Sequence, residues 1–375
     1  MLKILTIFSA ALTLAMLYAP QPLLPLFAQY FNISLNKVSL IISFALIPLA
    51  FAPLIYGYLL EKFSSKYILI TSLFACGILQ IFCTFAKDFE LFLFLRILQA
   101  LCFPAILTTL LTVLTRTQSE NVQKNVALYV GATTFGGLFG RVMSSFLADL
   151  FSWQMSLNFF AVCMIFCALL FVRLKDNNTV KLQKPNFFDF IPFVKDFKIL
   201  LIFCSIFVVF FSFQAIMSFL PFYAKTHFEN ISQAQIGFLY MGFIMGIVVS
   251  AFISQITKIL GSKARVVILG LMLYILGTLM MALPSFILVF GAMFVFCGGM
   301  FICHCVLSAL LNLNSNKKGI ANGLYLSFYY SGGAFGSVLP SFFYQTFGWQ
   351  MLCFVIAFLL LIILFVFIRF RYYYK

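Results

Sequence analysis

The sequence predicts an all-α polytopic membrane protein in which twelve transmembrane helices form two parallel six-helix halves. Three observations support this class. The chain is 64% hydrophobic and 9% charged, with a mean hydropathy of +1.11, whereas soluble chains are about half apolar and a quarter charged. The basic residues gather on alternate connections, and one stretch of sequence occurs twice. Together these features indicate two related halves in a lipid bilayer.

Breaks at charged or turn-rich positions separate twelve apolar segments, each long enough for a helix that crosses a bilayer, which needs about 20 residues. The first segment is too long for the apolar core of a signal peptide, about 7–15 residues, so it is predicted to be a helix. The predicted helices span 4–30, 38–60, 67–86, 90–114, 125–150, 153–173, 199–224, 234–257, 266–284, 286–312, 320–346 and 349–368.

The one long polar connection, 174–198, separates six predicted helices from six. It therefore marks a cytoplasmic linker between an N-terminal half, 1–173, and a C-terminal half, 199–375. The halves are related in sequence, because residues 128–155 align without a gap with 324–351 at an offset of 196 (324 − 128), and thirteen of the 28 pairs are identical. Related halves of this kind usually hold a substrate site between them, so the repeat indicates a transporter.

The formal net charge of +15 is distributed as expected for a membrane protein. If the N-terminus is cytoplasmic, nineteen Lys and Arg residues lie on the inner side, and the outer side keeps only Lys37, Lys87 and Lys225. An excess of basic residues on the cytoplasmic side is the normal topology signal. We therefore expect both termini in the cytoplasm and a lipid bilayer, with no nucleic acid, as the partner of this charge.

Several motifs carry a resemblance to a known family. They are Tyr18-x-x-Gln21-Pro22-Leu23-Leu24-Pro25, Leu128-Tyr129 followed by Gly136-Gly137-x-x-Gly140-Arg141, His304, and Tyr325 with Tyr329 and Tyr330. With these residues the chain resembles the major facilitator superfamily, in particular the bacterial YnfM-like inner-membrane permeases of the arabinose-efflux type. The resemblance covers essentially the whole chain. It implies the major facilitator fold and alternating-access transport of a small molecule, usually outward and usually driven by protons.

The connection between the second and third predicted helices resembles the cytoplasmic loop signature of that superfamily. Gly57, Glu61, Lys62 and Lys66 keep its first glycine, its acid and two of its bases. The resemblance implies a cytoplasmic gate, in which Glu61 could hold a helix N-terminus or a nearby base. The alternative is an ordinary solvated loop charge.

Buried charge gives the candidate substrate site. An arginine near the bilayer centre costs at least about 2.5–3.5 kcal/mol, so it normally faces protein or water and marks a pathway. Only Arg96, Arg141 and His304 lie deep in predicted helices, and a rise of about 1.5 Å per residue places both arginines at the level of Tyr18 and Gln21. We expect the two arginines, Tyr18 and Gln21 to line the substrate cavity. Gln99 should join them, because it forms with Arg96 an Arg-x-x-Gln pattern similar to that of the superfamily's fourth helix. The alternative is that the arginines cap carbonyls or brace helices.

Proton coupling has few candidate groups, because all nine acidic residues fall in loops or at helix ends. Asp149, two turns from Arg141, and His304, whose side chain has an unperturbed pKa of about 6.5, are the two candidates. His304 could instead be a structural polar residue. Tyr325 and Tyr329 lie one turn apart and could form the opposite wall of the cavity.

Glycines recur in both halves and predict close helix packing. They are Gly136, Gly137, Gly140, Gly332, Gly333 and Gly336. The fifth helix departs from the superfamily's antiporter signature, since Gly137 stands where that pattern has proline and Arg141 where it has its last glycine.

Other classes of function find little support. Cys303-His304-Cys305 is the one ligand-like cluster, but adjacent helical residues point in different directions, so we expect no metal and no cofactor. An enzyme would need a nucleophile, a metal or paired carboxylates within the bundle. We therefore expect a monomeric secondary transporter that exports a small organic solute in exchange for protons. The alternatives are proton-independent uptake or facilitated exchange of a polar or anionic solute, and a non-transporting scaffold.

Overall fold

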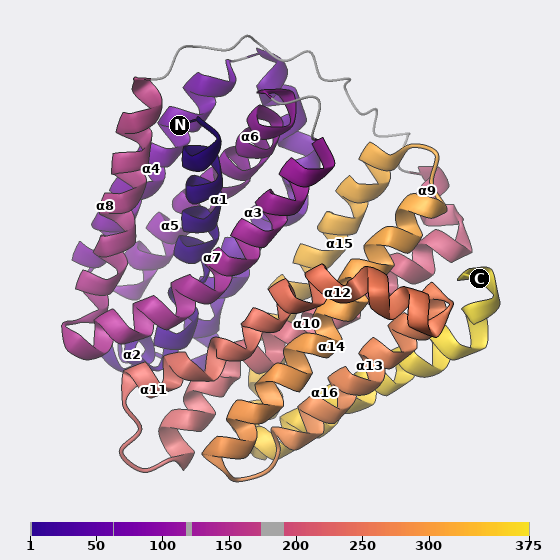
Figure 1. Ribbon diagram of the computed structural model, residues 1–375. Coiled ribbons are helices and arrows are strands. Elements are labelled where there is room, and N and C mark those ends of the chain that lie inside the picture. Colours follow the sequence, from indigo (N-terminus) through magenta and orange to yellow (C-terminus); the bar gives the residue numbers. More distant parts are fainter. Residues whose placement is uncertain (1, 63, 118–121, 174–190, 375) are drawn as a thin grey trace. The chain divides into compact units, whose positions relative to one another are not determined.

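The computed structural model describes residues 2–62, 64–117, 122–173 and 191–374, and every regular element within these ranges is a helix (Figure 1). The chain divides into two compact units. The first unit contains Met1–Lys184 together with Ser232–Gly237, and the second contains Pro185–Ile231 together with Phe238–Lys375. A short piece of the later sequence thus belongs to the first unit.

The first unit is built from eight helical elements of the N-terminal half, a 3-10 turn, and one short later helix. Its elements are α1 (Leu2–Tyr18), η1 (Gln21–Leu23), α2 (Leu24–Tyr30), α3 (Leu35–Lys62), α4 (Ser65–Phe85), α5 (Phe89–Ala100), α6 (Cys102–Thr117), α7 (Val122–Leu150), α8 (Trp153–Val172) and α11 (Gln233–Phe238), whose last residue already belongs to the second unit. Within this unit α1 packs along α7, and α4 packs along α8.

The second unit repeats this pairing with later helices. Its elements are α9 (Ile191–Lys195), α10 (Phe197–His227), η4 (Leu239–Ile244), α12 (Met245–Leu260), α13 (Lys263–Met280), α14 (Phe286–Leu313), α15 (Lys318–Val338), α16 (Pro340–Phe370) and η5 (Arg371–Tyr374). Here α10 packs along α15, and α13 packs along α16. In the second half, α10 and α15 take the places that α1 and α7 have in the first, and α13 and α16 take those of α4 and α8. The aligned stretches 128–155 and 324–351 include parts of α7, α8, α15 and α16.

Ten helical stretches in the described ranges are long and apolar enough to cross a membrane. They include ten of the twelve predicted spans. The other two, predicted at 38–60 and 320–346, fold as the helices α3 and α15. The helical class predicted from the sequence is therefore confirmed, and the chain is a multi-pass membrane protein.

One predicted helix near the C-terminus needs correction. The helix predicted at 320–346 is interrupted, because α15 ends at Val338 and a new helix starts at Pro340. Proline has no N–H to donate, so it favours the first turn of a helix over its interior. The following helix bends at Gly348, whose φ of 79° and ψ of −175° lie outside the helical region, and this bend coincides with the predicted gap between 346 and 349.

The glycines of the repeat sit where helices touch. A Cβ on Gly136 would lie 1.9 Å from the carbonyl oxygen of Ala11, and one on Gly332 would lie 2.2 Å from that of Phe207. The two contacts are equivalent, since both residues of the second pair follow those of the first by 196 positions (332 − 136 and 207 − 11). Gly140 and Gly336 repeat the relationship one turn later, against Ala15 and Phe211. Only glycine lets these backbones approach so closely.

Other repeated features fix the ends of the first helix in each half. Asn32 and Asn230 both have positive φ, 49° and 55°, a conformation that asparagine tolerates better than most residues. The aromatic contacts are repeated too. Trp153 packs against Phe27 with ring centroids 5.1 Å apart, and the Tyr223 ring lies 4.8 Å from Trp349. The first helix of each half therefore ends with equivalent asparagine and aromatic contacts.

Candidate functional site

The first helix breaks where two prolines fall close together. Regular α1 ends at Tyr18, and the chain continues through Pro20 into the 3-10 turn η1. Because proline cannot donate, Pro20 leaves the carbonyl of Met16 without its helical partner, and Pro22 does the same to Tyr18. The second half has no proline at either equivalent position, and α10 runs unbroken from Phe197 to His227. The two prolines therefore interrupt the segment predicted as one helix over 4–30.

Arg141 of α7 binds at this break. Its Nε donates to the Gln21 side-chain oxygen at 2.8 Å, and one terminal nitrogen donates to the Gly137 carbonyl at 2.7 Å. Its guanidinium carbon lies 4.1 Å from the centre of the Tyr18 ring. Arg141 and Gln21 are fully buried, and Tyr18 is 5% exposed. The neighbouring Ser144 donates to the Ala19 carbonyl at 2.8 Å, so α7 is tied to the break at two levels.

Arg96 of α5 reaches the same break from a separate network. Its guanidinium donates to the carbonyls of Leu17 and Met16, at 2.7 and 3.3 Å, and to the side-chain oxygen of Gln99. Gln99 in turn donates to the Cys76 carbonyl at 3.0 Å and to the Gln80 oxygen at 3.2 Å. Arg96 is 1% exposed. It thus satisfies the carbonyl that Pro20 leaves without a helical donor.

The predicted four-residue wall is therefore divided between two clusters. The structure brings Tyr18, Gln21 and Arg141 together and places Arg96 with Gln99 in the carbonyl network. Both arginines are anchored to the broken helix, which explains how two cations are accommodated within apolar helices.

In the second unit, His304 of α14 meets two tyrosines of α15. The Tyr325 hydroxyl donates to the His304 carbonyl at 2.9 Å and lies 3.2 Å from the Nδ1 of the same residue. The Tyr329 ring centroid is 4.9 Å from the imidazole and 3.7 Å from the stacked ring of Phe210. His304 is half-buried, while Tyr325 is 2% exposed. The three residues singled out in this half thus form one cluster.

Asp149 lies apart from Arg141, at the exposed end of α7. Its carboxylate accepts a hydrogen bond of 2.8 Å from the backbone N–H of Gln233, the first residue of α11. The Gln233 side chain donates to the Pro22 carbonyl at 2.9 Å, which is again part of the broken first helix. A Cβ on Gly237 would meet the Ser145 side chain at 2.4 Å. These contacts hold α11 in the first unit.

The predicted cytoplasmic gate is described only in part. Gly57, Glu61 and Lys62 lie in the last turns of α3, and the surroundings of these three residues are outside the described set. Lys66 lies in the first turn of α4, where the Ser64 side chain caps the helix by accepting from the Tyr67 N–H at 3.1 Å. The gate remains a prediction.

Three contributors to these clusters were not among the predicted site residues. Pro20 shapes the break, Gln80 joins the Arg96 network, and Gln233 joins the Asp149 contact. The first two carry a signal in the sequence, because a proline or a lone amide within an apolar helix needs an explanation. Gln233 gives no such signal, since it reaches the first unit from 84 positions beyond Asp149.

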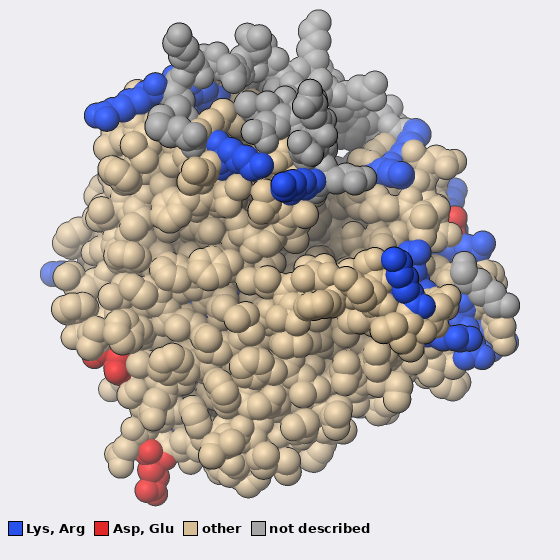
Figure 2. All heavy atoms as spheres, in the orientation of Figure 1, with Lys and Arg blue, Asp and Glu red and all other residues tan. Residues whose placement is uncertain are grey.

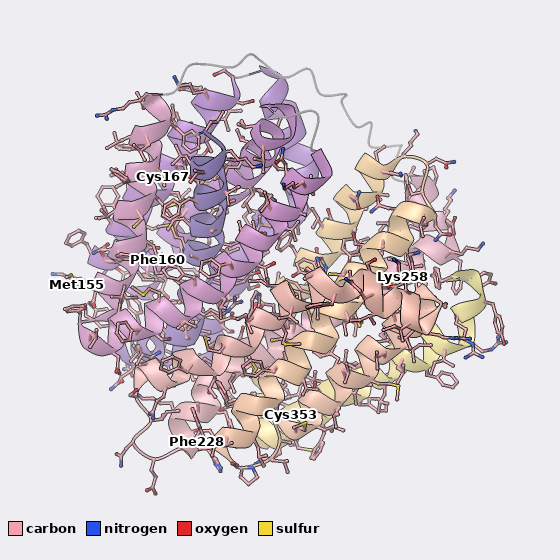
Figure 3. All side chains as sticks on the ribbon, in the orientation of Figure 1. Met155, Phe160, Cys167, Phe228, Lys258 and Cys353 are labelled. Carbon is pink, nitrogen blue, oxygen red and sulfur yellow. The ribbon has the colours of Figure 1, made fainter. Side chains whose placement is uncertain are left out.

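No three His, Cys, Asp or Glu side chains gather into a metal-binding group among the residues that the structure describes. The ten cysteines are all free thiols. Cys167 and Cys353, for example, lie on the different helices α8 and α16 (Figure 3). Buried, unpaired cysteine commonly acts as a small apolar residue.

Comparison with known proteins gives a consistent result. The family model described as Major Facilitator Superfamily matches residues 6–337, and it matches residues 202–374 a second time. The Inner membrane transport protein YnfM of Escherichia coli is 27% identical over 370 residues, 96% of this chain and 88% of that protein. The uncharacterized MFS-type transporter YybF of Bacillus subtilis is 25% identical over 360 residues, 94% of this chain and 89% of that protein.

Solved structures share the fold. The nucleoside transporter NupG superposes with a TM-score of 0.84 at 15% identity, covering 100% of both chains. The human organic anion transporter MFSD10 (TETRAN) superposes with a TM-score of 0.71 at 15% identity, covering 98% of both chains. At this level of identity the similarity concerns the fold alone.

Proposed function

This chain belongs to the Major Facilitator Superfamily, and from that premise we propose that it exports a small polar or anionic organic solute across the inner membrane in exchange for protons. That it is a membrane transporter and not an enzyme follows from its relatives. Direction, coupling and solute class are the proposal. The proposal also includes alternating access as the mechanism, both termini in the cytoplasm, and a monomer as the working unit.

The observation that carries the proposal is the position of Arg141. Arginine inside a membrane is costly and usually functional, and this one is held in a single orientation by a ring, an amide and a carbonyl. A planar guanidinium suits carboxylate or phosphate recognition better than any other side chain. The acidic side chains that the structure describes, Asp88, Glu90, Asp149, Asp196 and Glu229, are all exposed. The interior of the described bundle therefore favours a solute with negative or lone-pair-rich groups.

His304 is the proposed proton carrier. Because the Tyr325 hydroxyl donates to the His304 carbonyl, its oxygen is oriented to accept a hydrogen from Nδ1. That arrangement favours the tautomer with hydrogen on Nδ1 and leaves Nε2 to take up the transported proton. The Tyr329 ring packs against the imidazole and would attract it more strongly once it is protonated.

Helix α11 supplies the proposed moving part. It docks on the first unit through Asp149 and Pro22, whereas the residues after Gly237 belong to the second unit. The 3-10 stretch η4 follows α11 directly and leads into α12, and 3-10 geometry within a longer helix often marks a hinge. We propose that this dock opens and closes once in each transport cycle.

Collapse of a pH gradient in inverted membrane vesicles tests the coupling. Organic acids, nucleosides, sugars and cationic drugs are added in turn to vesicles with wild-type protein or with Arg141→Ala. The proposal expects collapse for an acidic or polar class and its loss in the variant. Collapse by cationic drugs alone, with Arg141→Ala unaffected, would refute the solute class.

Proton-independent uptake or facilitated exchange is the second candidate, favoured by the exposure of every described carboxylate. The same vesicles separate the two candidates. Labelled solute that crosses without any change in the pH gradient supports the facilitator and overturns proton exchange.

A further inference from the structure

A cavity of about 490 Å³ lies in the second unit, where α12 ends and α13 begins. Lys258, near the end of α12, marks its position in Figure 3. Figure 2 shows Lys and Arg side chains gathered over this end of the unit, near the C-terminus of the chain. The cavity shares no residue with the Arg141 and His304 clusters, and transport chemistry does not account for it.

Part of the cavity lining is basic. Lys258 in the last turn of α12 and Lys263 at the start of α13 contribute two ammonium groups, and Gly261 and Ser262 lead into the first turn of α13. A helix N-terminus presents backbone N–H groups and a positive dipole end to an anion. Ser262 makes no capping bond to this turn, whereas Ser64 does cap the equivalent helix α4. The N–H groups of α13 therefore do not have the serine cap that α4 has.

The rest of the lining mixes apolar and polar groups. Leu310, Leu313 and Asn314 lie at the end of α14, and Tyr373 and Tyr374 lie in η5. Leu313 is 67% exposed and Tyr373 is 46% exposed. Exposed leucine and tyrosine beside basic residues are typical of the boundary between lipid tails and headgroups. A free anion would gain nothing from Leu313 and the Tyr373 ring, but a lipid would place its first methylenes there.

The C-terminal turn is fixed over the cavity by a specific contact. The Tyr374 hydroxyl donates to the Lys198 carbonyl at 2.6 Å, and the Lys198 ammonium lies 5.2 Å from the centre of the Tyr373 ring. Tyr374 is 2% exposed. The two tyrosines that line the cavity are thus held in place by contacts with Lys198.

We propose that this cavity binds the phosphate group of an anionic membrane phospholipid, with Lys258, Lys263 and the α13 N-terminus holding the phosphate and Leu313 and Tyr373 contacting the adjoining chains. The same phosphate chemistry could come from a free phosphate compound, but the exposed Leu313 and Tyr373 side chains favour the lipid. A basic residue near an anionic surface strengthens binding about fivefold.

Native mass spectrometry of the purified full-length protein tests this proposal with phosphatidylglycerol as probe and phosphatidylcholine as reference. Wild type should retain phosphatidylglycerol selectively, and K258Q/K263Q should bind it about twentyfold more weakly. The matched control K87Q/K225Q removes two exposed lysines elsewhere and should bind like wild type. Equal weakening in both double variants would overturn the site, because it would reduce the effect to net charge.

Two further variants keep the result interpretable. K258R/K263R preserves both positive charges and should bind phosphatidylglycerol selectively, as wild type does. This variant shows whether the two positions tolerate substitution without loss of folding. Leu313→Gln should weaken phosphatidylglycerol binding and leave unchanged any rise in unfolding temperature caused by millimolar inorganic phosphate. If inorganic phosphate instead competes away the lipid and Leu313→Gln has no effect, the lipid assignment is wrong and a free phosphate compound is the ligand.

Discussion

The guanidinium of Arg141 lies over the ring of Tyr18, 4.1 Å from its centre, and so joins α7 to the last turn of α1. The contact forms at the point where Pro20 and Pro22 end the regular helix. A side chain buried in this way has one orientation, set by the Tyr18 ring, the Gln21 oxygen and the Gly137 carbonyl. The positions of the two prolines thereby determine the orientation of the Arg141 guanidinium.

Substitution of this pair should separate charge from shape. Arg141→Lys keeps the charge but loses the planar fork and the stacking, so solute flux should fall at least tenfold. Tyr18→Phe keeps the ring and should stay within about threefold of wild type, whereas Tyr18→Leu removes a desolvated cation–π contact worth about 2 kcal/mol and should lose more than tenfold. Initial rates of labelled-solute flux in proteoliposomes measure both. Equal activity of the two Tyr18 variants would contradict the stacking role.

Arg96 has a different task, which stability measurements should reveal. Arg96→Leu removes the donor to the Met16 and Leu17 carbonyls and should lower the free energy of unfolding by about 1–3 kcal/mol, the cost of leaving such groups unsatisfied. Pro20→Ala returns the N–H that the Met16 carbonyl lacks. The double variant should therefore lose less than the sum of the two single variants, with a coupling of at least about 0.5 kcal/mol.

Unfolding in detergent, followed by circular dichroism, gives the three comparisons. Strictly additive losses would show that Arg96 does not act on the carbonyl freed by Pro20. A loss of flux in Arg96→Leu at unchanged stability would assign this arginine to the pathway instead.

The sequence was sufficient for the class of the fold because hydropathy and the repeat are properties of long stretches. Local breaks were harder. Pro340 starts a new helix inside a segment that hydropathy alone treats as continuous, whereas the bend at Gly348 falls in the predicted gap between 346 and 349. The joining of Tyr18, Gln21 and Arg141 could be anticipated from helix depth, since all three lie at one level. Gln99 could be placed with Arg96 from the Arg-x-x-Gln pattern. The Met16 and Leu17 carbonyls could not be identified, because depth does not tell which face of α1 a neighbouring helix meets.

His304 should be needed for coupling but not for solute passage. His304→Gln keeps a hydrogen-bonding side chain that cannot carry a proton near neutral pH. Solute exchange without a gradient should persist within about threefold, while gradient-driven accumulation should be abolished. Tyr325→Phe removes the hydroxyl beside Nδ1 and should give an intermediate loss. Accumulation and exchange are measured in the same proteoliposomes, and unchanged accumulation in His304→Gln would exclude the imidazole as carrier.

Alanine substitution should be harmful at glycines that touch a neighbouring helix and harmless at glycines with open space around them. Gly136→Ala would force a Cβ to within 1.9 Å of the Ala11 carbonyl, and Gly332→Ala would meet that of Phe207 at 2.2 Å. Both should lose folded protein, because the backbones themselves would have to separate. Gly131 and Gly291 are matched controls with nothing within 4 Å. Alanine there should be neutral or stabilising by about 0.5–1 kcal/mol. Fluorescence-detected size-exclusion chromatography compares the four variants, and similar profiles for all would argue against the close contacts.

Asp149 makes one of the two hydrogen bonds that hold α11 on the first unit, and loss of this bond should expose the residues that α11 covers. Ser145 is buried where Gly237 covers it, so a Ser145→Cys thiol should react slowly with an impermeant maleimide. Asp149→Ala removes a charged acceptor worth about 1.5–3 kcal/mol and should speed that reaction at least tenfold. Asp149→Asn retains an oxygen that accepts from the Gln233 N–H, and labelling should stay much closer to the slow rate. Labelling is followed by peptide mass at position 145. If the alanine and asparagine variants label equally fast, the negative charge and not the hydrogen bond holds the dock, and if neither exceeds the parent, Asp149 does not hold it at all.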